Sequence, residues 1–390
     1  MNKEKQMKLT IGVMYGAESV EHEISIISAI QAMEAIDKER YDVLPIYISK
    51  DKHMYTGSEL RELTSYKDIP RLLKRCTPIQ LVRINNEVVI RSIKANVFFK
   101  SKSIDLMIPI VHGSNSEDGT VAGFCKMLGV PYVGSDVIAA AVGQDKIFFK
   151  HILENSTLPV VPWFWFYGKN FEKNKDGILS KAKELGYPLV VKPATLGSSI
   201  GIMIANDEKT CIQAIEAAMM YDAKILVEQK IESMKEINCS VLDDKGTYKA
   251  SPLEEVIKSD EILSYHDKYE AGDKSKGMVS TSRIIPADIS EELTKKIQRL
   301  AIQTSEVIGV SGVVRIDFLY DSNNDIVYVN EINTIPGSLS FYLWKEAGIE
   351  FDRLMDILIE SAIARLRDQE RMIYSYDTNL LASFKKGGLK

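Results

Sequence analysis

The chain has 390 residues, and at about 150 residues per domain this length predicts two or three domains. Hydrophobic residues make up 45% and charged residues 26% of it, which excludes an intrinsically disordered protein. The 49 Lys and Arg against 54 Asp and Glu give a net charge of −5, which disfavours a nucleic-acid partner because such proteins usually carry a basic domain or stripe. The four cysteines form no Cys-x-x-Cys pair, so they predict a reducing cytoplasm rather than a disulfide scaffold or a zinc site.

The first third of the chain alternates strands and helices. Lys8–Tyr15 is typical of a buried strand, Ser25–Ile36 has apolar residues at helical spacing, and Val43–Ile48 is a second strand. This βαβ order favours a parallel sheet, which Ile104–Val111 would extend. The intervening segment 51–102 contains Val88–Ile93 and Val97–Phe99 as strand candidates and is expected to be a surface excursion. No run of about 20 apolar residues occurs, so we expect no membrane helix and no membrane partner.

The rest of the chain predicts two smaller α+β units. In the middle third, the helix Asp145–Asn155 precedes the strands Leu189–Lys192 and Lys224–Glu228. In the last third, the helix Ser290–Ile308 precedes the paired strands Gly312–Leu319 and Ile326–Asn330. We therefore expect an α/β substrate-binding domain at 1–134, a small central domain at 135–227, a third domain at 228–370 with metal and catalytic residues, and a polar tail at 371–390.

One glycine- and serine-rich loop is a candidate phosphate site. The chain contains neither G-x-x-x-x-G-K-[ST] nor G-x-G-x-x-G, which disfavours P-loop and Rossmann nucleotide binding. Instead, an apolar strand ends at Lys192, and the loop that follows contains Gly197 and Gly201. Glycine lets backbone N–H groups approach phosphate oxygens, and a lysine beside them neutralises charge. The alternative is an ordinary turn of a β-hairpin.

Two neighbouring strands carry a second candidate site. Because strand side chains alternate between faces, Arg315 and Asp317 share one face, and Glu331 and Asn333 share one face of the next strand. Two carboxylates and an amide oxygen are the hard ligands that Mg²⁺ prefers. The alternative is a solvated hairpin face with cross-strand ion pairs. The apolar residues flanking Asp317 and Glu331 favour the functional interpretation.

Three further segments contain candidate ligand-binding residues. The strand 226–228 runs into Glu228, with Glu236 beyond it, and would suit an adenine and a ribose; a solvated acidic turn explains the pattern equally well. Ser19–Ser25 and His112–Thr120 each follow an apolar strand, where open α/β sheets bind ligands. Glu21 in the first of these also suits the positive end of a helix, which is a purely structural explanation.

Taken in order, these segments resemble the D-alanine–D-alanine ligase family of the ATP-grasp superfamily. The resemblance extends from about residue 8 to residue 365 and rests on SVEHEIS, HGSNSEDGT, PYVGS, QDK, VVKPATLGSSIG, LVEQ, KY, VRIDF and NEINTIPG. It implies an α/β fold of three domains, with an N-terminal open parallel-sheet domain and two α+β domains that clamp ATP.

The resemblance also implies roles for individual positions. The ATP-binding positions are Lys146 and Lys192 for the phosphates, Gly197, Ser199 and Gly201 in the loop over them, Glu228, Gln229, Lys230 and Ile231 at the adenine, Glu236 at the ribose, and Lys268. The metal positions are Asp317, Glu331 and Asn333, for two Mg²⁺ or Mn²⁺ ions. The catalytic positions are Arg315 at the acyl phosphate, Glu21 at the ammonium of the first D-alanine, Ser198 and Tyr269 around the amino acids, and Ser338. The remaining substrate-binding positions are His112, Gly337 and Ser340.

The implied activity is the ATP-dependent joining of two D-alanines through a D-alanyl phosphate, for peptidoglycan precursors, by a cytoplasmic homodimer. Two departures from the family pattern leave alternatives open. The segment Ser338–Trp344 is short, and His266 and Asp267 stand in the loop expected to close over the site. The chain could therefore use another second substrate, such as D-serine, D-lactate or a different amine. A nucleotide-binding regulatory protein without turnover is the alternative from another class.

Overall fold

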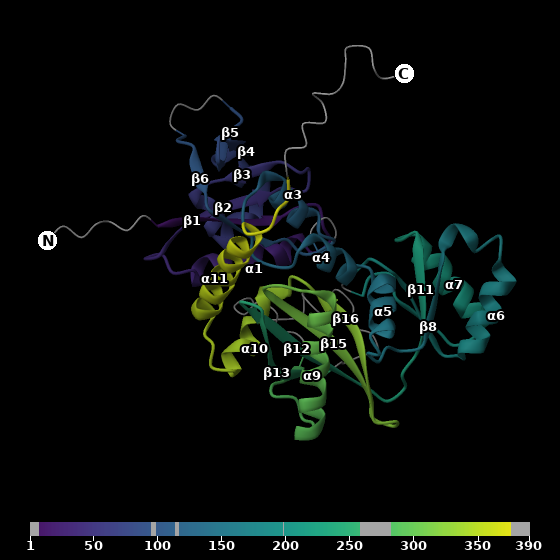
Figure 1. Cartoon of the computed structure of the whole chain (residues 1–390). Helices are drawn as coiled ribbons and strands as arrows, with labels where there is room; N and C mark the ends of the chain where they lie inside the picture. The colour runs from purple at the N-terminus through teal and green to yellow at the C-terminus, as the bar shows by residue number, and fades with distance from the viewer. Residues whose placement is uncertain (1–7, 95–98, 114–116, 198, 258–281, 376–390) are drawn as a thin grey trace, which may run out of the picture.

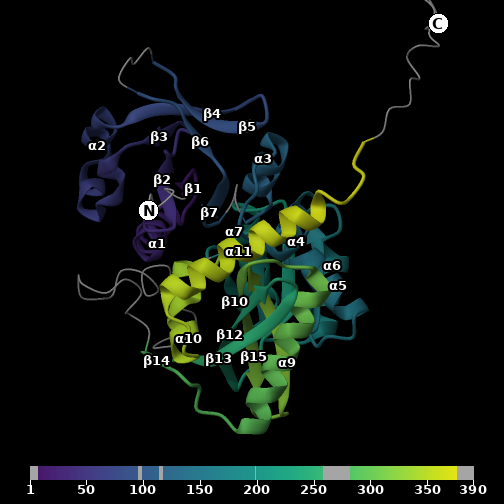
Figure 2. The same ribbon diagram turned by 60° about the vertical axis from the view of Figure 1, so that its left-hand side comes forward.

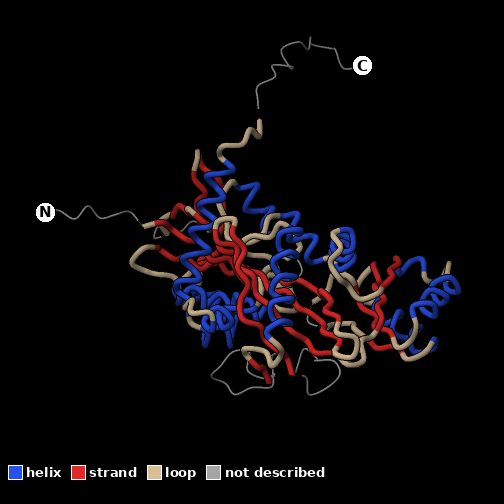
Figure 3. Tube along the Cα trace, turned by 60° about the horizontal axis from the view of Figure 1, so that its bottom comes forward, coloured by secondary structure: helices blue, strands red, loops and turns tan. Residues whose placement is uncertain are grey.

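The computed structural model describes residues 8–94, 99–113, 117–197, 199–257 and 282–375 (Figure 1). Three β-sheets organise these residues, with seven, four and five strands, and each sheet is flanked by helices (Figure 3). Within those ranges, no helix combines the length and the apolar character needed to cross a bilayer.

The N-terminal sheet is mixed, with strand order β6-β5-β4-β3-β2-β1-β7. Its strands are β1 (Leu9–Gly16), β2 (Tyr41–Ile48), β3 (Met54–Thr56), β4 (Thr77–Ile84), β5 (Glu87–Ser92), β6 (Lys102–Ile104) and β7 (Leu106–Ile110). The predicted parallel pairing is confirmed, because β1 lies between β2 and β7 and runs parallel to both. The strand expected at Val88–Ile93 is confirmed as β5, and the one expected at Val97–Phe99 falls largely outside the described residues. The surface excursion expected at 51–102 is wrong, because this segment contributes β3 to β6, which extend the sheet by antiparallel pairing.

The helices of this part of the chain are α1 (His22–Ala35), α2 (Ile69–Arg75), α3 (Thr120–Leu128), α4 (Val137–Gln144) and α5 (Lys146–Asn155). Helices α1 and α3 contact the sheet, whereas α4 and α5 pack on the unit that contains the five-stranded sheet and lead into the middle unit. Asp145 caps α5, because its carboxylate accepts hydrogen bonds from the first-turn amides of Ile147 and Phe148. This cap fixes the start of α5 at Lys146, a predicted phosphate ligand.

The middle unit is a four-stranded antiparallel sheet with two covering helices. Its strands are β8 (Trp163–Tyr167), β9 (Leu189–Pro193), β10 (Met203–Ala205) and β11 (Lys224–Gln229), and its helices are α6 (Lys175–Leu185) and α7 (Glu208–Met219). Alternate residues of β9 and β11, including Val191, Ile225 and Val227, pack on the helices in one buried cluster. On the other face, Leu226 of β11 packs with Ile147 of α5 in a smaller buried cluster.

The third unit is a five-stranded antiparallel sheet with order β14-β13-β12-β15-β16. Its strands are β12 (Met234–Asp244), β13 (Thr247–Ile257), β14 (Ser282–Ile284), β15 (Val313–Asp321) and β16 (Ile326–Asn333), and its helices are α9 (Glu291–Ile308), α10 (Phe341–Glu346) and α11 (Phe351–Gln369). Helix α9 packs along this sheet (Figure 2), and α10 and α11 contact β13 and β12, respectively.

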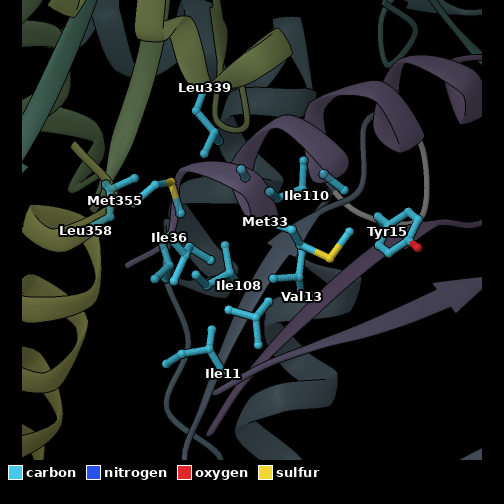
Figure 4. Packing of buried hydrophobic residues seen from close by; sticks show 14 of the residues in the cluster. Ile11, Val13, Tyr15, Met33, Ile36, Ile108, Ile110, Leu339, Met355 and Leu358 are labelled. Carbon is cyan, nitrogen blue, oxygen red and sulfur yellow. The ribbon is translucent and has the colours of Figure 1, made fainter. Parts of the chain in front are cut away.

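Helix α11 leaves this unit and packs on the N-terminal sheet. Met355 and Leu358 of α11 lie in one buried cluster with Ile11 of β1 and Met33 of α1 (Figure 4). Leu339, from the turn before α10, points into the same cluster. The first and third units therefore share a hydrophobic core, which fixes their relative position.

Candidate active site

A cleft lies between the middle and third sheets, with a volume of about 980 Å³ that includes its open mouth. Most of the positions implied for ATP line it. They are Lys146, Lys192, Gly197, Ser199, Glu228, Gln229, Lys230, Ile231 and Glu236, together with Glu331. Apolar walls come from Val190, Ile204 and Leu319. An apolar cleft with a few converging charges suits a flat base joined to phosphates.

Three charges are buried at the floor of this cleft. The Glu228 carboxylate lies between two lysines: Lys150 Nζ is 2.6 Å from Oε1, and Lys192 Nζ contacts Oε2. The two ammonium groups overcome the cost of burial and lower the pKa of Glu228 to about 2. Burial, together with the charge of Lys192, lowers the pKa of Lys150. The triad carries one net positive charge, which favours an anionic ligand beside Lys192.

The glycine loop lies between two functional groups from other units. Lys146 Nζ donates a hydrogen bond of 2.8 Å to the carbonyl of Leu196, and it lies 3.4 Å from Glu331 Oε2. On the other side, a methyl group placed on Gly197 would lie 3.7 Å from Glu21 Oε1. The loop therefore adjoins both the metal candidates and the carboxylate of the N-terminal domain.

The strands β15 and β16 bring the predicted charged cluster together. Arg315 pairs with Asn333 and Asp317 with Glu331 in the antiparallel register, so all four residues lie on one face. Arg315 holds Asp317 by two hydrogen bonds, of 2.6 Å from Nε and 2.8 Å from a terminal nitrogen. Asn333 Nδ2 donates a third, of 3.2 Å, to Asp317 Oδ2. The solvated hairpin face is wrong, because Asp317 is buried.

The chemistry of this cluster fits a hard divalent cation. Burial raises the pKa of Asp317 against the opposing effect of Arg315, and the Glu331 carboxylate raises it further. A divalent cation would relieve this repulsion between carboxylates. No group of three or more His, Cys, Asp or Glu in the described ranges could hold a metal by itself. Water and phosphate oxygens would therefore complete a shell begun by Asp317, Glu331 and Asn333.

A second polar network supports Arg315 from behind, and the sequence did not indicate it. Glu254 of β13 is buried, and it accepts hydrogen bonds of 3.0 Å from Asn238 and 3.1 Å from Tyr342. Arg283 lies 2.8 Å from its other oxygen. The negative charge of Glu254 helps to raise the pKa of Arg315, which keeps the guanidinium charged despite its burial. The sequence feature that could have revealed this network is Glu254 itself, a glutamate that directly follows the buried Leu253 in the middle of a strand.

The predicted amino-acid side is built from the ends of β1 and β7 and from the turn Gly337–Ser340. Glu21 lies close to Gly113, since a methyl group placed on Gly113 would lie 3.5 Å from Glu21 Oε2. His112 is buried, its Nδ1 lies 2.8 Å from the carbonyl of Ile335, and burial lowers its pKa. Glu117, which sequence reasoning did not single out, accepts hydrogen bonds from the backbone amides of Gly113 at 2.8 Å and Ile335 at 3.4 Å. These contacts join the N-terminal domain to the loop after β16.

The turn after Gly337 has an unusual backbone. Ser338, Leu339 and Ser340 have φ angles of 49°, 53° and 51°, and each such residue costs about 1–3 kcal/mol. Ser338 and Ser340 are both buried. Ser340 Oγ finds no hydrogen-bond partner among the described residues. Such strain persists only where surrounding contacts impose it, and it is concentrated at functional sites.

The remaining predicted positions either do not line the cleft or lie outside the described residues. Gly201 does not line the cleft; a methyl group there would lie 2.8 Å from Pro193 Cγ and 2.9 Å from Tyr221, at a φ of 73°. Ser198, Lys268 and Tyr269 lie outside the described residues, as does the loop Ser264–Gly277. Lys150, at the floor of the cleft, was missed, although it follows Lys146 by one helical turn on the same face.

The fold and the cleft together define a class. The sheets of the middle and third units enclose a cleft that Lys146 of α5 and Lys192 of β9 line on one side and Glu331 of β16 on the other, which is the arrangement of ATP-grasp enzymes.

Comparison with known proteins narrows this class to one family. The profile described as "D-ala D-ala ligase N-terminus" matches residues 10–135, and "D-ala D-ala ligase C-terminus" matches residues 152–360. The D-alanine–D-alanine ligase of Thermosipho melanesiensis is 39% identical over 374 residues, which cover 96% of this chain and 98% of that protein. The chain belongs to the D-alanine–D-alanine ligase family.

Solved structures agree with this assignment. The D-alanine–D-alanine ligase from Coxiella burnetii matches with a TM-score of 0.78 and 30% identity, over 93% of this chain and 96% of that one. The VanG D-Ala:D-Ser ligase from Enterococcus faecalis matches with a TM-score of 0.76 and 28% identity, over 91% of this chain and 100% of that one.

Proposed function

We propose that this chain joins two D-alanines into D-alanyl-D-alanine with ATP, for peptidoglycan precursor synthesis. The observation that carries the proposal is the position of Glu21, within reach of Gly197 and of Gly113. A carboxylate that binds an amino-acid ammonium there places the amino-acid carboxyl group beside the loop that faces the phosphates. That proximity is what phosphorylation of the carboxyl group requires.

The reaction proceeds in two steps. A carboxylate oxygen of the first D-alanine attacks the terminal phosphorus of ATP, ADP leaves, and a D-alanyl phosphate forms. The amine of the second D-alanine then attacks the acyl carbon, loses a proton, and expels phosphate as the peptide bond forms. Lys146 and Lys192 bind the phosphates, and Arg315 stabilises negative charge on the acyl phosphate and on the tetrahedral species.

The nucleotide and metal positions complete this assignment. We propose that Glu228, Gln229, Lys230 and Ile231 contact the adenine, that Glu236 binds the ribose, and that Ser199 and Gly201 belong to the phosphate loop. Asp317, Glu331 and Asn333 would hold two Mg²⁺ or Mn²⁺ ions, which neutralise phosphate charge when bound. The inward ion pairs of Glu228 favour contact with the adenine through the strand backbone rather than through its carboxylate.

The acceptor site is assigned to the turn after β16. Ser338 and Gly337 would bind the carboxylate of the second D-alanine, with Ser340 and His112 close to them. Ser198, Lys268 and Tyr269 would act from the segments expected to close over the amino acids and exclude water, which would otherwise hydrolyse the acyl phosphate.

The proposal also covers the roles of the domains, the oligomeric state and the cellular compartment. Residues 1–134 would bind amino acids, 135–227 and 228–370 would clamp ATP, and 371–390 would form a tail. We propose a cytoplasmic homodimer. The unpaired Cys76, Cys125, Cys211 and Cys239 and the requirement for ATP support that compartment.

The test is ADP release by the purified chain with ATP, Mg²⁺ and D-alanine, and products are identified by mass. We expect one D-alanyl-D-alanine for each ADP, and loss of both products in the Glu21→Gln variant. Parallel reactions contain D-serine, D-lactate or L-alanine. ADP release that requires D-alanine together with another acceptor would reassign the second substrate. Tight ATP binding without any ADP release would instead favour a regulatory role.

A further inference from the structure

Ser28 lies at the meeting point of helix α1, His112 and the strained turn. Its side chain is fully buried. Ser28 Oγ accepts a hydrogen bond of 2.9 Å from the backbone amide of Ser338, and it lies 3.1 Å from His112 Nε2. None of the motifs in the sequence assigned it a role.

The direction of each hydrogen bond follows from the partners. The carbonyl of Ile335 only accepts, so His112 Nδ1, at 2.8 Å, carries the proton. In the neutral ring, which burial favours, Nε2 is then an acceptor. The Ser28 hydroxyl therefore donates to His112 and accepts from Ser338. Because both ring nitrogens of His112 have partners, the ring acts on the acceptor site through the two segments that it joins.

We propose that Ser28 is a positioning residue for the acceptor site: through His112 and the amide of Ser338 it holds the left-handed turn Ser338–Ser340 in its binding conformation. The inference rests on the proposed function, because it takes that turn as the site of the second D-alanine. Ser28 itself contacts no substrate.

The strained turn explains why such support is needed. Three consecutive residues without glycine have positive φ, so the turn relaxes unless contacts impose it. Leu339 fixes the middle of the turn by packing in the core beside α11 (Figure 4). Ser28 fixes its first residue, since the buried amide of Ser338 loses its acceptor when the hydroxyl is removed.

The same helix offers a matched control. Ser25, one turn earlier on α1, is also fully buried and also joins two backbone groups: it accepts from Gly16 and donates to Ile110. Those partners belong to β1 and β7 alone. Ser25→Ala therefore removes an equivalent pair of hydrogen bonds without touching the turn.

The kinetic test measures the donor and acceptor KM for D-alanine and the KM for ATP in Ser28→Ala and Ser25→Ala. We expect Ser28→Ala to raise the acceptor KM about tenfold, with the donor and ATP KM unchanged, whereas Ser25→Ala leaves the acceptor KM unchanged. Ser28→Cys, which keeps the volume and a weaker donor, should fall between. An unchanged acceptor KM in Ser28→Ala, or an equal rise in Ser25→Ala, overturns the inference.

A spectroscopic test is independent of activity. Nitrogen-15 NMR of the wild-type histidine side chains, with His112 identified by its loss in His112→Gln, reports which ring nitrogen carries the proton. We expect a proton on Nδ1 and none on Nε2. A proton on Nε2 overturns the inference even if the chain forms no D-alanyl-D-alanine, an outcome that by itself would overturn only the proposed function.

Discussion

Replacing Lys150 with methionine removes one of the two cations that hold the buried Glu228 carboxylate. Methionine keeps the length and the apolar stem of the side chain, so packing between α5 and β11 is preserved. Lys192 remains, and it lines the cleft. The variant therefore isolates the electrostatic contribution of Lys150 to the folded state.

The two lysines lower the pKa of Glu228 from 4.5 to about 2, a change equivalent to about 3 kcal/mol. Removing one partner of a buried ion pair usually costs about 3–5 kcal/mol. The variant also avoids the cost of burying the Lys150 ammonium, which offsets part of this loss. We therefore expect the free energy of unfolding at pH 7 to fall by about 2–3 kcal/mol.

Urea unfolding followed by circular dichroism measures this loss. Because the pKa of Glu228 is lowered on folding, the stabilisation is present above pH 4.5 and lost toward pH 2. The difference between wild type and variant should therefore shrink in acid. The control is Lys295→Met, which breaks an exposed pair with Glu291 and should cost less than about 0.5 kcal/mol. Equal losses for the two variants would refute the reasoning.

Three other predictions concern the charged cluster, a buried acid and a tight turn. Arg315→Lys loses the two-pronged contact with Asp317, so we expect steady-state kinetics to show kcat reduced about 100-fold; an unchanged kcat would contradict the role of Arg315. Burial, with the nearby Glu21, raises the pKa of Glu117 from 4.5 to about 8, so stability should fall as pH rises from 4.5 to about 8 and then level off; urea midpoints measured between these two pH values should decline less in Glu117→Gln. Gly201→Ala should lower the free energy of unfolding by about 1–3 kcal/mol, and more than Gly246→Ala, which shares a positive φ but has open space; equal losses would exclude a steric cause.

The sequence predicted the charged cluster well because it depends on a simple period. Alternation along two adjacent strands is enough to place Arg315 beside Asp317 and Glu331 beside Asn333, and the antiparallel register confirms that all four share a face. The bulge after Asp317 could not be foreseen, since it depends on how β15 and β16 pair.

Features that depend on long-range contacts were missed. The three-residue strands β3 and β6 are too short to show a pattern, so the strand predicted at Val88–Ile93 could not be connected to the sheet and its surroundings were interpreted as an excursion. Lys150 resembles any helical lysine until β11 brings Glu228 against it. Serine and leucine have no preference for positive φ, so nothing in Ser338–Ser340 indicated a left-handed turn. These positions take their conformation from partners distant in the chain.

The packing of α11 on the N-terminal sheet has a consequence for synthesis. Ile11 and Leu358 belong to one core, so the segment that leaves the ribosome first completes its packing only when the segment near residue 358 has emerged. Arg365 adds to this closure, because it donates hydrogen bonds to the carbonyls of Tyr132 and Gly134. A nascent chain lacking α11 would expose the apolar surface of α1, where a chaperone could bind.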